Sequence, residues 1–303
     1  MNMKRLTSAL VLAVGFFCVE VAVAQDEEIK KPSLVQTSPY TKSITQERTS
    51  LPYHAVQEAD IMWSKKVWRV IDLREKINFP LYYPTQRMRN RHSLIQVLVD
   101  SIKHGAIRAY TTDNSDFVDT LSFKEIAKRF EAVDTVEKRP SLEDASVMVD
   151  VPVKGVWRWS EVKQVEVLEE WFFDRRRSVL DVRIIGLCPI RVFHKMLKTG
   201  GEEQEDEADD SELNRTQLFW VYYPDIRNVL TRTMAFNARN QGQEYSFDDI
   251  FLKRKFSSYI VKEANVQNDR RINSYTIGGI PNMLESQRVY DEIMSQEQDM
   301  WEY

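Results

Sequence analysis

Two adjacent carboxylates in an aromatic setting come nearest to a catalytic pattern in this chain. Glu169 and Glu170 precede Trp171, and paired carboxylates beside an aromatic side chain can act as acid and base in a glycan-cleaving enzyme. Adjacent residues on a strand point to opposite faces of a sheet, however, so these two side chains could not flank one bond. We therefore expect Glu169 and Glu170 to be structural.

The histidines and cysteines do not form a metal or nucleophile grouping. His54, His92, His104 and His194 are not spaced as metal ligands to one another or to Cys188. The nine glycines in 303 residues leave little room for phosphate-binding loops, and a nucleophile elbow is absent from the sequence. Cys188 follows an apolar run, which is typical of a buried thiol. The sequence thus predicts no catalytic, cofactor-binding or metal-binding residue, and no cofactor.

The first residues have the pattern of a secretory signal peptide. Lys4 and Arg5 precede an apolar run at residues 9–23, and the run ends in the small-x-small pattern of Ala22 and Ala24. We expect cleavage after Ala24, which removes Cys18 and leaves a chain without a direct lipid anchor. The chain is therefore predicted to be exported.

The stretch that begins at Asp60 is predicted to be a helix with two apolar faces. At about 100° per residue, one stripe of this helix would face a core. That stripe comprises Trp63, Val67, Val70, Ile71 and Ile77. Ile61 and Trp68 fall outside the stripe, beside Lys65 and Asp72. A second apolar face indicates a second contact surface, although a helix enclosed within one domain is the alternative.

This geometry predicts different roles for the two tryptophans. We expect Trp63 to hold the fold together, so that Trp63→Ala destabilises it by about 2 to 5 kcal/mol. Trp68→Ala is expected to leave the fold intact and to weaken assembly. The predicted partner interface comprises Ile61, Lys65, Trp68 and Asp72, together with Arg175, Arg176 and Arg177.

The central part of the chain has the clearest strand pattern. Residues 156–173 and 178–187 are rich in Val, Ile, Trp and Phe, and a turn at 174–178 separates them. Apolar and charged residues alternate, which predicts a long hairpin with one apolar and one charged face. Glu166 and Glu170 should lie within cross-strand reach of Arg183.

The fold class that follows is α+β, with mixed helices and antiparallel strands around a long central β-hairpin and with flexible termini. Helices are expected over residues 93–104 and after the capping box at Ser122 and Glu125, and a strand over 106–110. Residues 202–212 carry eight acids and no base, which predicts a solvated loop, with a calcium site as the weaker alternative. The predicted segments are a signal peptide (1–24), a flexible arm (25–50), a first α/β unit (51–150), the hairpin region (151–199), an acidic disordered loop (200–212), a second α/β unit (213–264) and an extended C-terminal tail (265–303) that orders on a partner or not at all.

An internal duplication is a further interpretation of the two α/β units. Tyr-Tyr-Pro at 82–84 is repeated at 222–224, and the short sequence segments that begin at Ser122 and Ser246 are also similar. Each pair brackets a helix followed by a strand.

Several long sequence segments resemble those of the GldN/PorN family of the Bacteroidetes type IX secretion and gliding apparatus. They are the run from Val70 to Lys76 with the nearby Trp63 and Trp68, the run from Pro80 to Pro84, and residues 169–174 and 182–190. The resemblance covers most of the chain from about residue 60 to about residue 260.

The resemblance implies a structural, non-enzymatic periplasmic subunit that is peripherally associated with the outer membrane. It would form a ring with an outer-membrane lipoprotein of the GldK/PorK type and contact a motor protein of the GldM/PorM type. Nucleic acid is excluded as a partner mainly by export. The alternative is a periplasmic carbohydrate-binding or glycan-processing protein that uses a Trp-rich surface.

Overall fold

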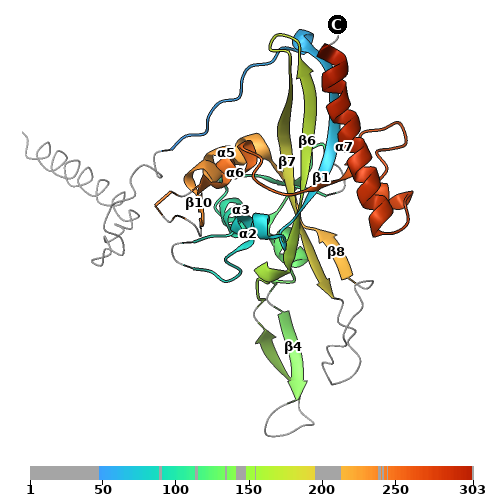
Figure 1. Ribbon diagram of the computed structural model, residues 1–303. Coiled ribbons are helices and arrows are strands. Elements are labelled where there is room, and N and C mark those ends of the chain that lie inside the picture. Colours follow the sequence, from blue (N-terminus) through green and yellow to red (C-terminus); the bar gives the residue numbers. More distant parts are fainter. Residues whose placement is uncertain are drawn as a thin grey trace, which may run out of the picture. The chain divides into compact units, whose positions relative to one another are not determined.

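An antiparallel sheet is the framework of the chain (Figure 1). The computed structural model describes residues 48–88, 91–112, 115–133, 135–140, 148–153, 155–194, 213–237, 240, 242–243 and 245–301, with backbone alone at 135–140, 148–153, 194 and 301. The sheet has the strand order β12-β1-β6-β7-β9-β2-β3, and β8 also pairs with β7. β4 pairs with β5 and β10 with β11 in two separate hairpins.

The strands are β1 (Ile61–Asp72), β2 (Ala109–Tyr110), β3 (Thr120–Leu121), β4 (Thr135–Pro140), β5 (Met148–Val153), β6 (Val162–Asp174), β7 (Val179–His194), β8 (Leu213–Gln217), β9 (Trp220–Tyr222), β10 (Met234–Ala235), β11 (Tyr245–Ser246) and β12 (Tyr259–Glu263). The helices are α2 (Phe79–Tyr82), α3 (Leu94–Lys103), α4 (Phe123–Arg129), α5 (Tyr223–Arg232), α6 (Phe247–Leu252) and α7 (Gly279–Trp301). Antiparallel strands with helices confirm the predicted α+β class.

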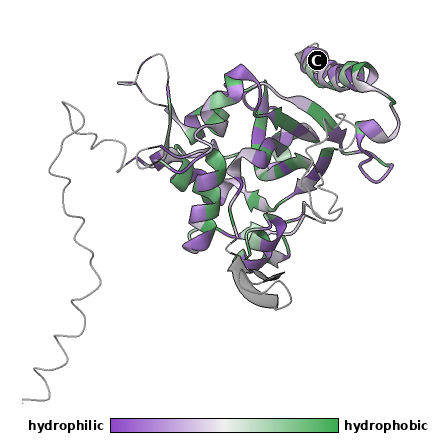
Figure 2. Cartoon of the chain, turned by 90° about the horizontal axis from the view of Figure 1, so that it is seen from below, coloured by the Kyte–Doolittle hydropathy of each residue, from purple (hydrophilic) through white to green (hydrophobic). Residues whose placement is uncertain are grey.

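Three buried apolar clusters hold these elements together. The main core joins the sheet to α3, α5 and α6 through residues that include Leu98, Leu230 and Phe251. The cluster beneath α7, called the α7 cluster, consists of Val67, Trp171, Ile260, Ile272, Val289 and Ile293. The indole cluster consists of Trp68, Leu168, Cys188 and Trp220. Figure 2 shows hydrophilic and hydrophobic residues alternating along the helices, as expected where one side of a helix packs on a sheet.

The prediction of a helix from Asp60 is wrong, because the segment forms β1. Trp63, Val67 and Ile71 share one face of this strand on the two-residue period, and Trp68 lies on the other face. Val67 is buried in the α7 cluster and Trp68 in the indole cluster. A strand buried on both faces has apolar residues at intervals of four, which a helix would also have.

The predicted central hairpin is confirmed. β6 and β7 pair from Val162↔Arg191 to Asp174↔Val179, with the turn at residues 175–178. Glu170 lies directly opposite Arg183, as predicted, whereas Glu166 is buried and pairs with Arg271 at 2.9 Å. The face with Val165 and Val167 packs into the main core. The opposite face was predicted to be charged, but Leu168 and Cys188 on it are buried in the indole cluster, so that part of the prediction is wrong.

Capping boxes begin α3, α4 and α6, and they confirm the two helices predicted in the first half of the chain. Ser93, Ser122 and Ser246 are the N-cap residues. α3 to α4 and α5 to α6 share one order of elements, a helix, a short hairpin and a capped helix. Tyr82 ends α2, however, whereas its counterpart Tyr222 ends β9. The duplication therefore stays a prediction.

The C-terminal residues form a long helix, so the prediction of an extended tail is wrong. α7 spans 23 residues, and Val289 and Ile293 on its inner side are almost fully buried. In Figure 1 α7 (red) runs alongside β1. The predicted signal peptide, most of the arm and the acidic loop lie outside the described residues. At the end of the arm, Arg48 pairs with Asp249 of α6 at 2.9 Å.

Candidate functional site

Four of the predicted interface residues meet at the tip of the β6–β7 hairpin. The Arg175 backbone N–H donates to the Asp60 carbonyl at 2.9 Å, and the Arg176 guanidinium lies 3.7 Å from the Asp60 carboxylate. Ile61 follows Asp60 and is exposed. Arg177 instead pairs with Asp174 and Asp181 at 2.8 and 2.7 Å.

The Arg177 guanidinium therefore stabilises the turn between β6 and β7 through these two ion pairs. Its hydrogen bond to Asp174 lowers the pKa of that carboxyl below its usual value. Arg175 and Arg176 are the cations that the tip offers to a partner.

The other three predicted interface residues lie elsewhere. Trp68 has 5% of its surface exposed and lies beneath the Lys262 ammonium, 4.0 Å from the ring centroid. Asp72, at the far end of β1, pairs with Arg74 at 2.7 Å. Burial raises the pKa of Asp72, but the hydrogen bonds from Arg74 outweigh this and hold that pKa below its usual value. A continuous surface from Ile61 through Trp68 to Asp72 is therefore not present, because the segment is a strand about 36 Å long at about 3.3 Å per residue.

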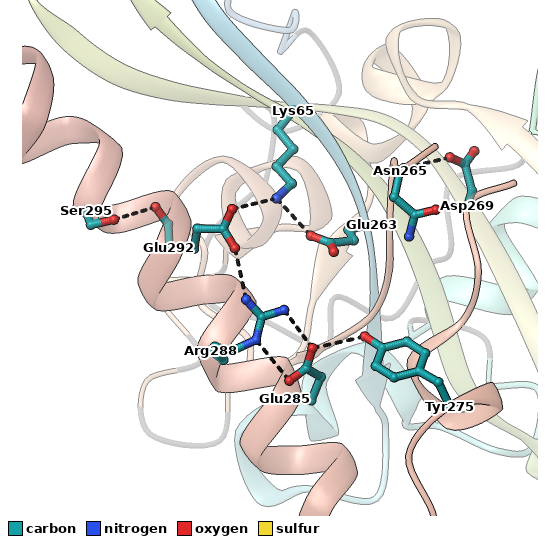
Figure 3. A network of polar contacts seen from close by, with 9 residues as sticks. All are labelled: Lys65, Glu263, Asn265, Asp269, Tyr275, Glu285, Arg288, Glu292 and Ser295. Carbon is teal, nitrogen blue, oxygen red and sulfur yellow. Dashed lines mark hydrogen bonds and ion pairs between the residues drawn. The ribbon is translucent and has the colours of Figure 1, made fainter. Parts of the chain in front are cut away.

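Lys65 belongs to a polar network that fastens α7 to the sheet (Figure 3). Its ammonium lies 2.8 Å from Glu263 of β12 and 3.5 Å from Glu292 of α7. Arg288 bridges Glu292 and Glu285, at 3.2 and 2.6 Å. The hydrogen bond from Arg288 lowers the pKa of Glu285.

The inner side of α7 completes this attachment. The Ile260 N–H of β12 donates to the Ser286 hydroxyl at 2.8 Å, so a helix side chain satisfies a strand amide. Tyr290 packs edge-on against Trp171 at 6.4 Å between centroids, and the Arg69 guanidinium lies 5.6 Å from the Tyr290 ring centroid. Sequence reasoning missed α7, although Ser286, Val289 and Ile293 have helical spacing.

The first turns of α7, together with Ile277 just before the helix, present apolar side chains to solvent. Ile277, Ile280, Met283 and Leu284 are 95%, 76%, 58% and 66% exposed. We call these four residues the outer patch. Large exposed apolar groups gathered on adjacent helical turns mark an interaction surface. Their spacing, at three and four residues from Ile280, is the signal by which the sequence could have revealed them.

A groove of about 450 Å³ lies where α3 ends and the β2–β3 pair begins. Ile102, Ile107, Leu121 and Phe123 supply its apolar lining, and Arg108 is the charged residue among the described residues that line it. We call it the α3–β3 groove. β3 is the last strand of the sheet path, so the groove lies at a sheet edge.

The carboxylates that resembled a catalytic pair are separated as expected. Glu169 is fully buried, pairs with Arg254 at 3.0 Å and accepts a hydrogen bond from the Trp171 indole at 3.2 Å. Glu170 lies on the opposite face of β6. Cys188 is a buried thiol, as predicted, and burial raises its pKa well above the usual value.

The tryptophans whose burial the structure describes are all buried or half-buried, which does not favour a sugar-binding platform. Trp68, Trp159, Trp171 and Trp220 are buried, and Trp157 is half-buried in a stack on Trp159 with 5.1 Å between centroids. Among the described residues, we find no group of three or more histidine, cysteine or acidic side chains placed to hold a metal ion. A search of the same residues found no helix long and apolar enough to cross a membrane.

The fold and these surfaces define an α+β protein whose exposed features are suited to contacts with other proteins. A family model described as "Gliding motility associated protein GldN" matches residues 56–302. The chain belongs to this GldN family, which associates it with gliding motility and type IX secretion and implies protein partners. The match confirms the resemblance and extends it through α7. None of the curated proteins matches the chain significantly.

Proposed function

We propose that the chain is a structural, non-enzymatic subunit of the type IX secretion apparatus. It is exported to the periplasm, is peripherally associated with the outer membrane and forms a ring-like complex with a GldK/PorK-type lipoprotein. It also contacts a GldM/PorM-type motor component. Its work is to hold these partners in register, so that force or a conformational change reaches the secretion channel.

The family match over residues 56–302 carries this proposal. The character of the exposed surface supports it: the hairpin tip offers Arg175 and Arg176 beside the exposed Ile61 and Met62, and α7 offers the outer patch. Exposed apolar groups beside cations are typical of protein-binding surfaces, and buried tryptophans give a sugar-binding role no support.

Co-purification tests the proposal. A tagged full-length chain is isolated from the cell envelope and its assembly mass is measured by light scattering, in cells with and without the lipoprotein. We expect a large complex that contains the lipoprotein and that breaks down when the lipoprotein is deleted. A monomer of unchanged mass in both strains, together with normal secretion after deletion of the chain's own gene, would contradict it.

The hairpin tip provides a sharper version of the test. Exchange of Arg175 and Arg176 for glutamate reverses the charge at the tip, and we expect the loss of one protein partner from the purified complex at unchanged thermal stability. The matched control is Arg158→Glu, a charge reversal at an exposed position outside the tip.

A further inference from the structure

The outer patch and the α3–β3 groove belong to opposite ends of one sheet. α7 is attached to β12, the first strand of the sheet path, and the groove adjoins β3, the last. Each feature is incomplete by itself: the patch is a set of apolar side chains that are each more than half exposed, and the groove is an apolar depression open to solvent. Their positions allow one copy to present the patch while its neighbour presents the groove.

The shapes of the two features are complementary. Ile280, Met283 and Leu284 project from one side of a helix, which is how a helix that binds in a groove presents its anchoring residues. The groove, of about 450 Å³, is shallow and open to solvent, so side chains from outside can reach its apolar lining. Ile107 at its base is buried, and Leu121 and Phe123 at its sides are half-buried.

The charges are complementary as well. α7 carries Glu285, Asp291, Glu292, Glu297 and Asp299 against Arg288, a net charge of −4 from one base and five acids. Asp291 lies two turns beyond Leu284 on the exposed side of the helix, and the charge in the lining of the groove is the cation Arg108. Two α7 helices placed against each other would bring like charges together, which disfavours a symmetric contact through this helix.

We propose that the outer patch of one copy of this chain binds the α3–β3 groove of the next copy, in a head-to-tail contact. Such a contact uses two different surfaces of the same chain, so it repeats from copy to copy and gives either a closed ring or an open filament. The inference rests on the proposed function, and it specifies which surfaces make the contact between neighbouring subunits.

Site-directed crosslinking tests this contact in the full-length chain within the cells that make it. Leu284→Cys places a thiol in the patch, and Thr120→Cys places one at the groove. Cys188 is buried, and Cys18 would be removed with the predicted signal peptide, so the otherwise unmodified chain is the control for background crosslinking. Both positions are exposed, so the variants should fold. An unchanged midpoint of thermal unfolding verifies this.

With a short bismaleimide, cells that express both single variants should yield crosslinked dimers, and the double variant should yield a ladder of multiples. Each single variant alone should remain monomeric. The matched control pairs Thr120→Cys with Gln298→Cys, an exposed position near the other end of α7, and should not crosslink. Ile280→Asp added to the double variant should reduce the ladder at least tenfold.

Three outcomes overturn the inference. Dimers from Leu284→Cys alone would show a symmetric contact between helices. A lack of crosslinks in a preparation where the chain purifies within a large complex would refute this contact and leave the proposed function standing. A chain that enters no complex and gives no crosslinks would refute both.

Discussion

The main core and the α7 cluster hold helices to the same sheet by different means. In the main core, side chains of α3, α5 and α6 are buried together, and even the Arg227–Asp248 pair is 6% and 4% exposed. α7 is attached by Val289 and Ile293, surrounded by ion pairs whose members reach 56% exposure. The main core therefore sets the stability of the whole fold, whereas α7 is an element that can open locally.

The largest loss of stability is expected from the charged pair inside the main core. Asp248 accepts hydrogen bonds from Tyr223, Arg227 and Thr231. Asp248→Ala leaves the Arg227 guanidinium buried without its carboxylate, which should cost about 3 to 5 kcal/mol of unfolding free energy. Urea denaturation measures this cost. Asp225→Ala, an exposed acid on α5, the helix that carries Arg227, should change it by no more than about 1 kcal/mol.

The second expectation reverses the roles that sequence assigned to the two tryptophans. Trp68→Ala empties part of the indole cluster and should cost about 3 to 5 kcal/mol. Trp63 is half-buried at the edge of the α7 cluster, so Trp63→Ala removes less apolar contact and should cost no more than about 2 kcal/mol. Urea denaturation of both variants compares the costs. A larger loss for Trp63→Ala would restore the original assignment.

The error at β1 has a physical cause. Trp63, Val67 and Ile71 recur at intervals of four, which suits both a strand face and a helix stripe, and Val70 and Trp68 are buried on the opposite face. Strands covered on both sides lose the alternation that identifies them. The β6–β7 hairpin was predictable because charged and apolar residues still alternate along parts of its strands and because a polar turn separates them.

The site was less accessible from sequence than the fold. The sequence identified Arg175 and Arg176 by their place in a predicted turn, and it identified Ile61 as an apolar residue outside the predicted core stripe. Their proximity depends on the β1–β6 register. The lining of the α3–β3 groove lies within residues 102–123 and depends on the pairing of β2 with β3, two strands of two residues each that are too short to show an alternating pattern. α7 was missed because its polar composition concealed the narrow stripe from Ser286 to Ile293.

A smaller and local effect should follow from a cavity beneath α7. Ile293→Ala removes a buried side chain from the α7 cluster, and we expect a loss of about 2 to 4 kcal/mol in the opening free energy of this helix. Native-state hydrogen exchange should show faster exchange of α7 amides, with β6 and β7 amides largely unchanged. Met283→Ala on the exposed side is the control. Equal acceleration in the central hairpin would mean that α7 unfolds only with the rest of the protein.

The smallest effect should come from the ion pairs around α7, and it should depend on pH. Arg288 lowers the pKa of Glu285 below its ordinary value of 4.5, so the pair contributes its full stabilisation above about pH 4.5 and loses it as the pH falls through the lowered value. Because Arg288 is more than half exposed, the contribution should stay within about 1 kcal/mol. Protection of α7 amides, corrected for intrinsic exchange rates, should therefore decrease on acidification from pH 6 to pH 3.5 in the unmodified chain. It should decrease less in Arg288→Gln, which has lost the pair at both pH values. An equal decrease in both proteins would mean that the Arg288–Glu285 pair contributes nothing measurable and that other acids near α7, such as Glu263 and Glu292, cause the pH dependence.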